Sequence, residues 1–416
     1  MSSQILSLFE GYGIEIEYAI VDHKTLDIKA IADEVIYALA GKYDNEVVSG
    51  DIVWSNELML HVIELKTNGP AKTLQGLSDL FHHDVKKINK ILEKQAARLM
   101  PTASHPWMMP NQDAKLWPHG DDEIYEAYDD IFDCSGHGWS NLQSVHLNLP
   151  FANDAEFECL HAAIRLILPI LPALCASSPL IEGKTTGFLD TRLKYYLENQ
   201  KTIASITGKL VPEAIFSPKE YKKNILERMY QDVAFYDKRG LIQEEWLNSR
   251  GAIPRFDRQS IEIRILDSQE APVADIAIIE IIVAMLKCLI QEGWLSLKTQ
   301  KTYHEDGLYH IFKEAIRLGS RAMISDSNYL KVFGYSKTSS PISIKELWLH
   351  ILESLQVKGY VESQAGHELV RKIVEQGSLS ERILKSLNGS NKMSDLKSVY
   401  QQLCDCLNEN RPFYLE

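Results

Sequence analysis

Short apolar segments with strand-like spacing occupy the first two thirds of the chain. Residues 14–21, 47–54, 57–67, 143–150 and 260–266 are rich in β-branched residues, and we predict that each forms a strand. Between them, residues 74–99, 155–175, 219–231 and 273–291 repeat apolar positions at helical spacing and predict long amphipathic helices. Their unequal spacing does not fit a doubly wound parallel sheet. We therefore expect an α+β fold with a largely antiparallel sheet.

The last third of the chain has the pattern of successive helices. Residues 309–318, 344–356, 363–376, 378–387 and 393–407 are helical in pattern and are separated by polar breaks. We expect residues 1–292 to form the main domain and residues 293–416 a helical extension packed on it. Residues 103–139 are instead rich in Pro, Gly, Asp, His and Trp. They predict a long loop region that borders the functional site and is a candidate lid.

Two acids stand close together in the first predicted strand. Glu15 and Glu17 are two positions apart, so their side chains project from the same face about 7 Å apart. Like charges brought to about 4 Å cost roughly 4 kcal/mol at an effective dielectric near 20. Converging acids therefore favour a bound cation between them. A solvent-facing strand with its polar residues outward is the alternative, and this pair alone does not decide between the two.

Glu57 and Glu64 lie among apolar residues, where acids need partners. Being seven positions apart, they have opposite parity, so one face of a regular strand cannot hold both. Either a bulge or a place for Glu57 at the strand entrance is required. His61 shares the parity of Glu57 and is a competing candidate, although a structural role is the commoner one for a histidine in a strand.

Two further strands repeat the same design. Residues 143–150 place His146 and Asn148 on one face, and residues 260–266 place Glu262 and Arg264 on one face, with apolar residues on the other. We therefore expect a sheet with helices on its outer side and a charged concave face. The combined set suits magnesium, or manganese, better than zinc because its ligands are hard oxygens with one imidazole. Its members are Glu15, Glu17, Glu57, Glu64, His146 and Glu262.

Several divalent ions on such a face would neutralise a polyphosphate tail during phosphoryl transfer, and Arg264 could reach the transferred phosphate as a planar cationic fork. Other nucleotide motifs are incomplete. The GKT at residues 183–185 lacks the upstream glycine of a P-loop, because Ser178 occupies that position. A nucleotide site would therefore be built by the sheet and its ions.

Composition and charge narrow the class of protein. The chain of 416 residues is 45% hydrophobic and 24% charged, with a net charge of −13, and it lacks the basic face of a nucleic-acid binder. The apolar run at residues 276–290 contains Glu280 and Lys287 and falls short of a membrane span. The six cysteines are scattered, which favours free thiols. With no signal-peptide pattern at the N-terminus, we expect a cytoplasmic protein.

A series of motifs resembles one known family. GIEIEYAIVD, LHVIELKTNGP, HPW, SVHLNL, SSPLIEGKTTGFLDTRLKYY and SIEIRILDSQEAPVAD follow one another in the order seen in glutamate-cysteine ligase family 2. That family includes carboxylate-amine ligases and belongs to the glutamine synthetase superfamily, so the resemblance implies a glutamine synthetase-like fold. It covers roughly residues 10–290. The segment from Ser177 to Arg192 is its most specific part.

The resemblance implies a role for each matching position. The six ligand candidates would hold magnesium ions that bridge the phosphates of ATP. Glu57 stands where related enzymes often have aspartate, whose side chain is one methylene shorter. Glu262 and Arg264 would serve catalysis, and Arg192 is similar to the arginine that holds the amino-acid carboxylate. For the other candidates a structural role, as a surface charge or a core aromatic residue, is an alternative to the functional role. These are Lys184, Arg255 and Arg258 for the nucleotide, and Trp107 and Trp139 for the substrate pocket.

The implied reaction joins glutamate to an amine, most simply cysteine, through an acyl phosphate made with ATP. A ligase with another amine acceptor and a non-catalytic relative are the alternatives. A metal-dependent phosphohydrolase is disfavoured, because the set offers only His146 as a water-activating base. The sequence leaves the oligomeric state open, with a homodimer among the possibilities.

Overall fold

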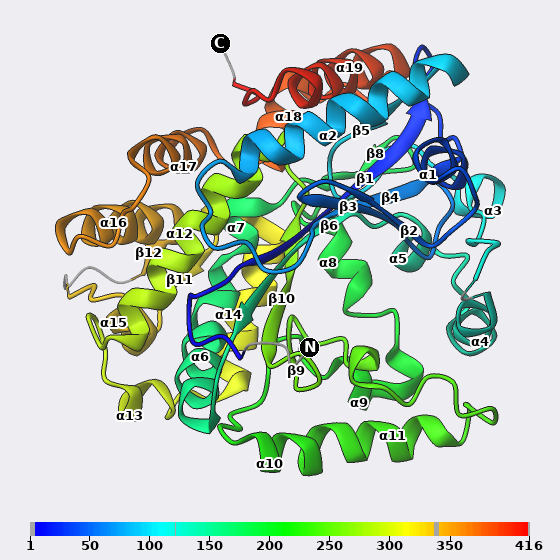
Figure 1. Ribbon diagram of the computed structural model, residues 1–416. Coiled ribbons are helices and arrows are strands. Elements are labelled where there is room, and N and C mark those ends of the chain that lie inside the picture. The colour runs from blue at the N-terminus through cyan, green and yellow to red at the C-terminus, as the bar shows by residue number, and fades with distance from the viewer. Residues whose placement is uncertain (1–4, 121, 337–340, 415–416) are drawn as a thin grey trace.

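An antiparallel sheet forms the centre of the computed structural model, which describes residues 5–120, 122–336 and 341–414 (Figure 1). In this part of the chain eight strands join in the order β2-β3-β4-β1-β6-β10-β9, and β5 also pairs with β1. All the pairings in this sheet are antiparallel. The strands are β1 (Gly13–Asp22), β2 (Glu46–Ser49), β3 (Ile52–Asn56), β4 (Val62–Thr67), β5 (Ala97–Met100), β6 (Ser144–Pro150), β9 (Ala252–Arg255) and β10 (Ser260–Asp267).

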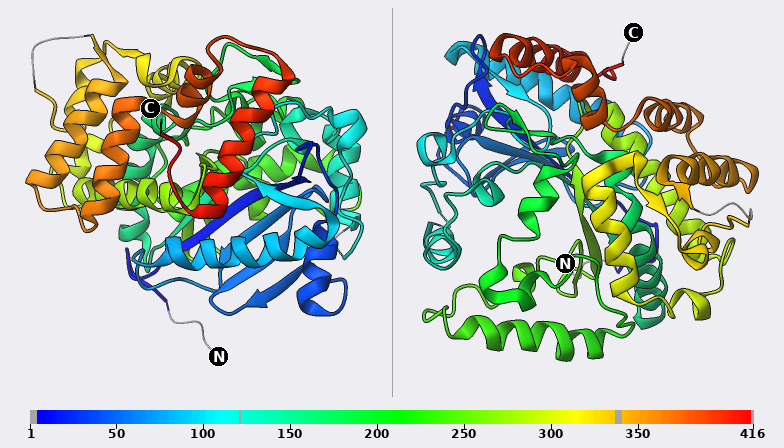
Figure 2. Two further views of the ribbon diagram at one scale, coloured as in Figure 1. Left: turned by 90° about the horizontal axis from the view of Figure 1, so that it is seen from above. Right: turned by 180° about the vertical axis from the view of Figure 1, so that it is seen from behind.

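Helices cover one face of the sheet and extend beyond it, as Figures 1 and 2 show. Two small hairpins, β7 (Leu180–Ile181) with β8 (Lys184–Thr185) and β11 (Met323–Ile324) with β12 (Ile342–Ser343), lie apart from the sheet. The helices are α1 (Ala32–Ala40), α2 (Leu77–Leu92), α3 (Pro110–Asp113), α4 (Asp122–Phe132), α5 (His137–Ser140), α6 (Asp154–Ile167), α7 (Pro172–Cys175), α8 (Thr191–Tyr196), α9 (Ala204–Thr207), α10 (Pro218–Tyr221), α11 (Glu227–Ala234), α12 (Pro272–Ile290), α13 (Leu297–Gln300), α14 (Glu305–Leu318), α15 (Ser327–Lys331), α16 (Ile344–Val357), α17 (Gln364–Gln376), α18 (Leu379–Leu387) and α19 (Met393–Glu409).

The apolar face of the central strand explains why the helices pack where they do. Ile14, Ile16 and Tyr18 of β1 are completely buried, and they alternate with the acids of the other face because side chains of a strand alternate. Trp54 of β3 donates through Nε1 to Asp84 of α2 at 3.0 Å, which ties α2 to this face. Helix α12 contacts α2, α6 and α17, so it is buried nearly all round. The predicted α+β class is confirmed.

Five predicted segments differ from the structure. The strand predicted over residues 57–67 begins only at Val62, because residues 57–61 connect β3 to β4. Residues 47–54 form the hairpin of β2 and β3, which turns at Gly50 with φ 71°. Helix α2 ends at Leu92, and residues 97–100 form β5 instead of more helix. Residues 155–175 are divided between α6 and α7, because Pro169 and Pro172 lack the N–H that a continuous helix needs. The predicted loop at residues 103–139 contains α3, α4 and α5.

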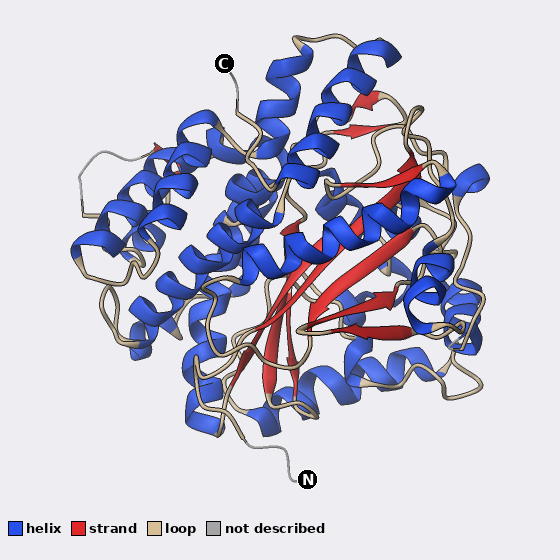
Figure 3. Cartoon of the chain, turned by 45° about the horizontal axis from the view of Figure 1, so that its top comes forward, coloured by secondary structure: helices blue, strands red, loops and turns tan. Residues whose placement is uncertain are grey.

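The C-terminal helices join the core of the rest of the chain. Helix α17 packs on α12, while α19 packs on α2 and β5 (Figure 3). The division of the chain near residue 292 stays a prediction. In the described ranges, no helix has both the length and the apolar character to cross a bilayer.

Candidate active site

A cavity of about 880 Å³ opens on the polar face of the sheet. Strands β1, β4, β6 and β10 supply its floor, while α8 and the ends of β9 and α5 supply part of its wall. Several of the candidates from the sequence line it: Glu15, Glu17, Glu57, Glu64, Trp139, His146, Arg192, Arg255, Glu262 and Arg264. Arg258 lines it as well.

Strand register brings the acids together. Glu15 pairs with His146 across β1 and β6, and Glu17 pairs with Glu64 across β1 and β4. On the next strand pair, Glu262 of β10 lies opposite Asn148 of β6. Directly paired residues share a face with Cβ atoms about 5 Å apart. Three strand pairs therefore place one row of polar side chains on the floor of the cavity.

One candidate cation site lies between Glu15, His146 and Glu262, each of which offers a ligand atom within 4.8 Å of the others. His146 Nδ1 is 2.9 Å from a Glu15 oxygen and 3.7 Å from a Glu262 oxygen. Asn148 donates to the second oxygen of Glu15 at 3.1 Å. Gly13 permits this approach, because a Cβ there would stand 2.9 Å from Asn148 Cβ.

A second candidate site lies beside the first and shares its histidine. Glu17, Glu64 and His146 also bring ligand atoms within 4.8 Å of one another. Ser144 fixes Glu17 with its backbone N–H at 2.8 Å and its hydroxyl at 3.0 Å, and Ser55 donates to Glu64 at 2.5 Å. Each carboxylate is thus held in place while facing the cavity. The sharing of His146 puts the two sites next to each other.

Glu57 lies in the loop between β3 and β4, just after β3 ends at Asn56. This position outside a regular strand resolves the conflict of parity with Glu64. Burial raises the pKa of Glu57 well above its usual value, and the nearby charges of Glu17 and Glu64 raise it further. Glu57 lines the cavity but belongs to neither cation site. His61 lies outside the cavity lining, is fully buried, and burial lowers its pKa to about 3.

Their surroundings shift the pKa values of two acids of the same face in opposite directions. Burial tends to raise the pKa of Glu15, but the hydrogen bond and charge of His146 hold it at about 2. For Glu64, burial and the charge of Glu15 raise the pKa to about 7. Carboxylates packed this closely are destabilised by each other unless a cation binds among them. The donors, hard oxygens and one imidazole, fit magnesium or manganese.

Cationic side chains stand around the acids. Arg264 lies where the register of β10 on β6 shifts between Ile263 and Leu266, and its Nε is 2.9 Å from Glu262. Arg255 Nη1 is 3.9 Å from the other oxygen of Glu262. Lys66 of β4 also lines the cavity, with Nζ 3.6 Å from Glu64. We did not single out Lys66 from the sequence, although its spacing of two from Glu64 places it on the same face.

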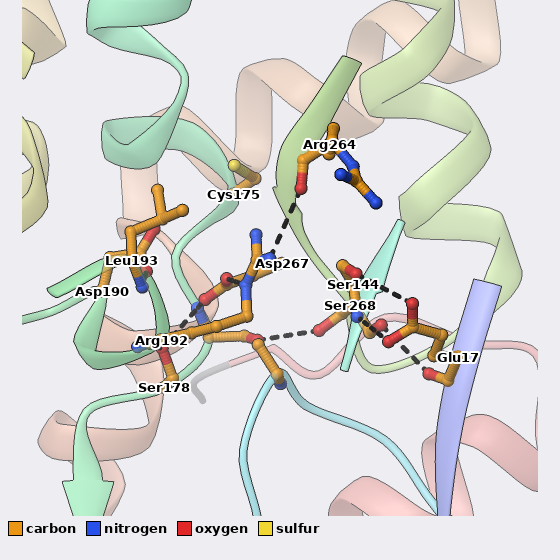
Figure 4. Close-up of polar contacts among 12 residues, drawn as sticks. Glu17, Ser144, Cys175, Ser178, Asp190, Arg192, Leu193, Arg264, Asp267 and Ser268 are labelled. Carbon is orange, nitrogen blue, oxygen red and sulfur yellow. Dashed lines mark hydrogen bonds and ion pairs between the residues drawn. The ribbon is translucent and has the colours of Figure 1, made fainter. Parts of the chain in front are cut away.

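A buried network fixes Arg192 at the wall of the cavity (Figure 4). Its Nε donates to Asp267 at 2.5 Å, and Nη1 donates to the backbone oxygen of Arg264 at 3.4 Å. Within the described residues, Arg192 Nη2 is buried without a hydrogen-bond partner, and so is Nε1 of Trp139. Both are donors on residues that line the cavity. Such donors can receive an anionic oxygen, for example that of a carboxylate.

Two predicted site residues lie outside the lining of this cavity, and their roles at the site stay predictions. Trp107 donates to Asp27 at 3.0 Å, and its ring packs edge-on against Tyr400 of α19 at 5.9 Å. Lys184 is exposed on β8, in a hairpin that lies away from the main sheet. An aromatic or basic residue in a loop shows its chemistry in the sequence but not its direction.

Comparison with known proteins identifies relatives along nearly the whole chain. A family model described as glutamate-cysteine ligase family 2 (GCS2) matches residues 12–402. An uncharacterized protein of Archaeoglobus fulgidus is 31% identical, with the match covering 96% of this chain and 99% of that protein. A protein of Corynebacterium glutamicum (strain R), provisionally named glutamate–cysteine ligase 2, is 23% identical over 67% of this chain and 66% of its own length.

A solved structure shares the fold. The glutamate–cysteine ligase of Francisella tularensis, solved in complex with AMP, superposes with a TM-score of 0.58 at 14% sequence identity. The superposition covers 96% of this chain and 89% of that one. The similarity confirms the expected glutamine synthetase-like architecture.

Proposed function

The chain belongs to glutamate-cysteine ligase family 2, and from this premise we propose that it is an ATP- and magnesium-dependent carboxylate-amine ligase that joins glutamate to cysteine. One observation carries the proposal. Two adjacent candidate cation sites share His146, and Glu262 of the first site lies 2.9 Å from Arg264 in the same cavity. Cations flanked by a guanidinium suit the transfer of a phosphoryl group. The AMP bound to the similar Francisella ligase supports a nucleotide substrate.

The reaction proceeds in two steps. The side-chain carboxylate of glutamate attacks the terminal phosphorus of ATP, which releases ADP and leaves a γ-glutamyl acyl phosphate. The amine of cysteine then attacks the acyl carbon, forms the amide bond and releases phosphate and a proton. Because water would compete with the amine, the acyl phosphate must form inside a closed cavity.

Each wall residue has a defined part in this scheme. The four acids of the two cation sites and His146 would hold magnesium, with Glu57 on the cavity wall beside them. When bound, the ions would neutralise phosphate oxygens and support phosphoryl transfer. Arg264 donates to the transferred phosphoryl group, where its planar fork stabilises the charge that develops. Arg192 uses its unpartnered Nη2 to hold the amino-acid carboxylate, and Trp139 offers its indole N–H beside it. Arg255 lies within reach of the nucleotide.

Product analysis tests the proposal. The protein is incubated with ATP, magnesium, glutamate and single amines including cysteine, and the product is identified by mass together with phosphate release. We expect γ-glutamylcysteine, with turnover that depends on all four components. Turnover with another amine but not with cysteine would replace the acceptor while keeping the ligase class.

A second set of measurements separates a ligase from a non-catalytic relative. Glu262→Gln removes a charge that both the first cation site and Arg264 contact. If the protein is a ligase, this variant loses turnover and binds divalent ions and nucleotide more weakly. Unchanged binding in Glu262→Gln, with no turnover by the wild-type protein, would support the non-catalytic alternative.

A further inference from the structure

A completely buried ion pair lies outside the cavity lining. Arg382 of α18 donates to Glu270 at 2.7 Å through Nη1 and at 3.4 Å through Nη2, and both side chains are fully buried. Neither residue lines the cavity. Charges removed from water this completely are kept only when their geometry is well satisfied. We therefore asked which segments of the chain this ion pair connects.

The pair joins three segments that are distant in sequence. The C-terminal tail enters through Phe413, whose backbone N–H donates to Glu270 at 2.9 Å and whose carbonyl accepts from Arg382. Arg382 Nε also donates to the carbonyl of Gly377 at 3.2 Å. The loop after β10, the start of α18 and the C-terminal tail are thus tied at one point.

The loop after β10 leads directly from this point to the partner of Arg192. Glu270 lies three residues after Asp267, which accepts from Arg192 at 2.5 Å. Between them, Ser268 donates to the carbonyl of Glu17 at 3.0 Å (Figure 4). Gln269 donates to the carbonyl of Cys175 at 2.6 Å. Every residue of the loop is therefore bonded. A displacement of Glu270 would be transmitted to Asp267.

Helix α18 also contacts the segment that carries Arg192 itself. The hydroxyl of Ser380 donates to the carbonyl of Leu189 at 2.5 Å, three residues before Arg192. Its backbone N–H donates to the carbonyl of Ala176 at 2.8 Å. Ala176 immediately precedes Ser177, whose backbone N–H donates to Asp267 at 2.7 Å. One turn of α18 thus supports both the arginine and the segment that holds its carboxylate partner.

We propose that the first turn of α18 and the C-terminal tail position Arg192 for binding the carboxylate of the amino-acid substrate, which gives the C-terminal region a part in substrate recognition. The inference rests on the proposed function only in the identity of that substrate. Arg192 Nη2 is buried on the cavity wall and unpartnered in the described part of the chain, so its aim depends on how Nε and the backbone are held. Binding sites need this geometry within about 0.5 Å. Glu270, Ser380, Arg382 and Phe413 are positioning residues.

Two mild variants test the proposal. Ser380→Ala removes the hydroxyl bonded to Leu189 but keeps the backbone bond to Ala176. A chain truncated after Arg411 lacks Phe413 and therefore loses its backbone bonds to Arg382 and Glu270. Matched controls are Ser394→Ala, an exposed serine of α19, and a chain lacking only residues 415–416. The readouts are calorimetric binding of glutamate with magnesium and a non-hydrolysable ATP analogue, binding of the analogue alone, and amide hydrogen exchange across residues 189–196.

We expect both variants to weaken glutamate binding by about tenfold, the usual scale for loss of a supporting contact. Binding of the ATP analogue should change less than about twofold, and residues 189–196 should exchange faster. Both controls should behave as the wild-type chain. Folded variants with wild-type glutamate affinity and unchanged exchange would overturn the proposal, and so would an equal loss of nucleotide binding.

Failure of the proposed function gives a different result. If the wild-type chain binds the ATP analogue but no glutamate, glutamate is the wrong substrate. Hydrogen exchange at residues 189–196 then decides the positioning proposal by itself, because that measurement needs no substrate. Faster exchange in both variants keeps the proposal, and unchanged exchange rejects it.

Discussion

Individual neighbouring side chains set the pKa of each acid on the polar face. Glu15 and Glu64 point into the same cavity, yet the pKa of Glu15 is about 2 and that of Glu64 about 7. The difference arises because His146 donates to Glu15 at 2.9 Å, whereas Glu64 has a hydroxyl partner and a lysine at 3.6 Å. His146 thus favours the charged form of Glu15, whereas burial and the charge of Glu15 disfavour the charged form of Glu64. Glu15 is the best single position at which to test for a cation.

Replacing Glu15 with glutamine should weaken binding of divalent ions by at least tenfold and abolish ligase turnover. The substitution keeps the shape of the side chain and its bond from Asn148, but it removes the negative charge next to the candidate cation site. Titration with Mn²⁺, followed by electron paramagnetic resonance, measures the affinity. Glu93→Gln, on an exposed turn after α2, is the matched control. Equal Mn²⁺ affinity in Glu15→Gln and Glu93→Gln would contradict the proposed cation site.

Helix α6 is packed against its neighbours partly through a buried histidine that stays neutral in the folded protein. Helix α6 begins at an N-cap where Asn153 accepts from the backbone N–H of Glu156, and it buries His161 against Phe157, with ring centroids 5.3 Å apart. Burial and, to a smaller extent, the charge of Arg165 lower the pKa of His161 to about 3. His161 is therefore neutral in the folded protein well below the pH at which an unfolded histidine is charged.

The sign of the pH effect follows from this shift. The pKa of His161 is lower in the folded state than in the unfolded state, where it is near 6.5. Above pH 6.5 the imidazole is neutral in both states, so burying it does not depend on pH. As the pH falls from 6.5 towards 3, only the unfolded state binds the proton, and the free energy of unfolding decreases. At pH 5 the loss amounts to about 2 kcal/mol for this one group. His161→Phe should lack that part of the loss, as measured by urea unfolding at pH 7.5 and pH 5. The exposed His83→Gln serves as control, and parallel pH curves for wild type and His161→Phe would refute the explanation.

At the scale of the whole molecule, the C-terminal helices complete the core. Helix α17 covers one side of α12, and α19 covers α2 and β5 (Figure 2). Val370 and Ile373 of α17 belong to the same apolar cluster as the sheet, and Leu403 of α19 belongs to a second cluster with Ala19 of β1. Removing these helices would expose much of α12, whose residues are apolar nearly all round.

A chain ending at residue 292 should therefore fail to unfold cooperatively and should aggregate. Exposure of several large apolar side chains costs about 1.5–3 kcal/mol each, which together exceeds the usual net stability of a domain. Circular dichroism with thermal unfolding, next to the full chain, measures the effect. A soluble fragment with a sharp transition would instead establish residues 1–292 as an independent domain.

The sequence by itself determined which side chains share one face of a strand, the family and the fold class. Alternation within a strand placed Glu15 with Glu17 and Glu262 with Arg264 on common faces, since a period of two needs no knowledge of neighbours. Motif order was enough to indicate the family, which the family model confirms. Lys66 could have been found in the same way, from its spacing to Glu64. The α+β class followed from the unequal spacing of the predicted strands and helices.

Only the tertiary structure decided which strands are neighbours and which side chains meet. The pairing of Glu17 with Glu64 and of Glu15 with His146 depends on register between segments far apart in the chain. Short apolar strands such as β5 give too few residues for a period to be recognised, so they were missed. Arg192 and Asp267 are 75 positions apart, and their contact depends on α18 and on a loop tied to the C-terminal tail. Local spacing carries no record of such contacts, because packing between distant segments creates them.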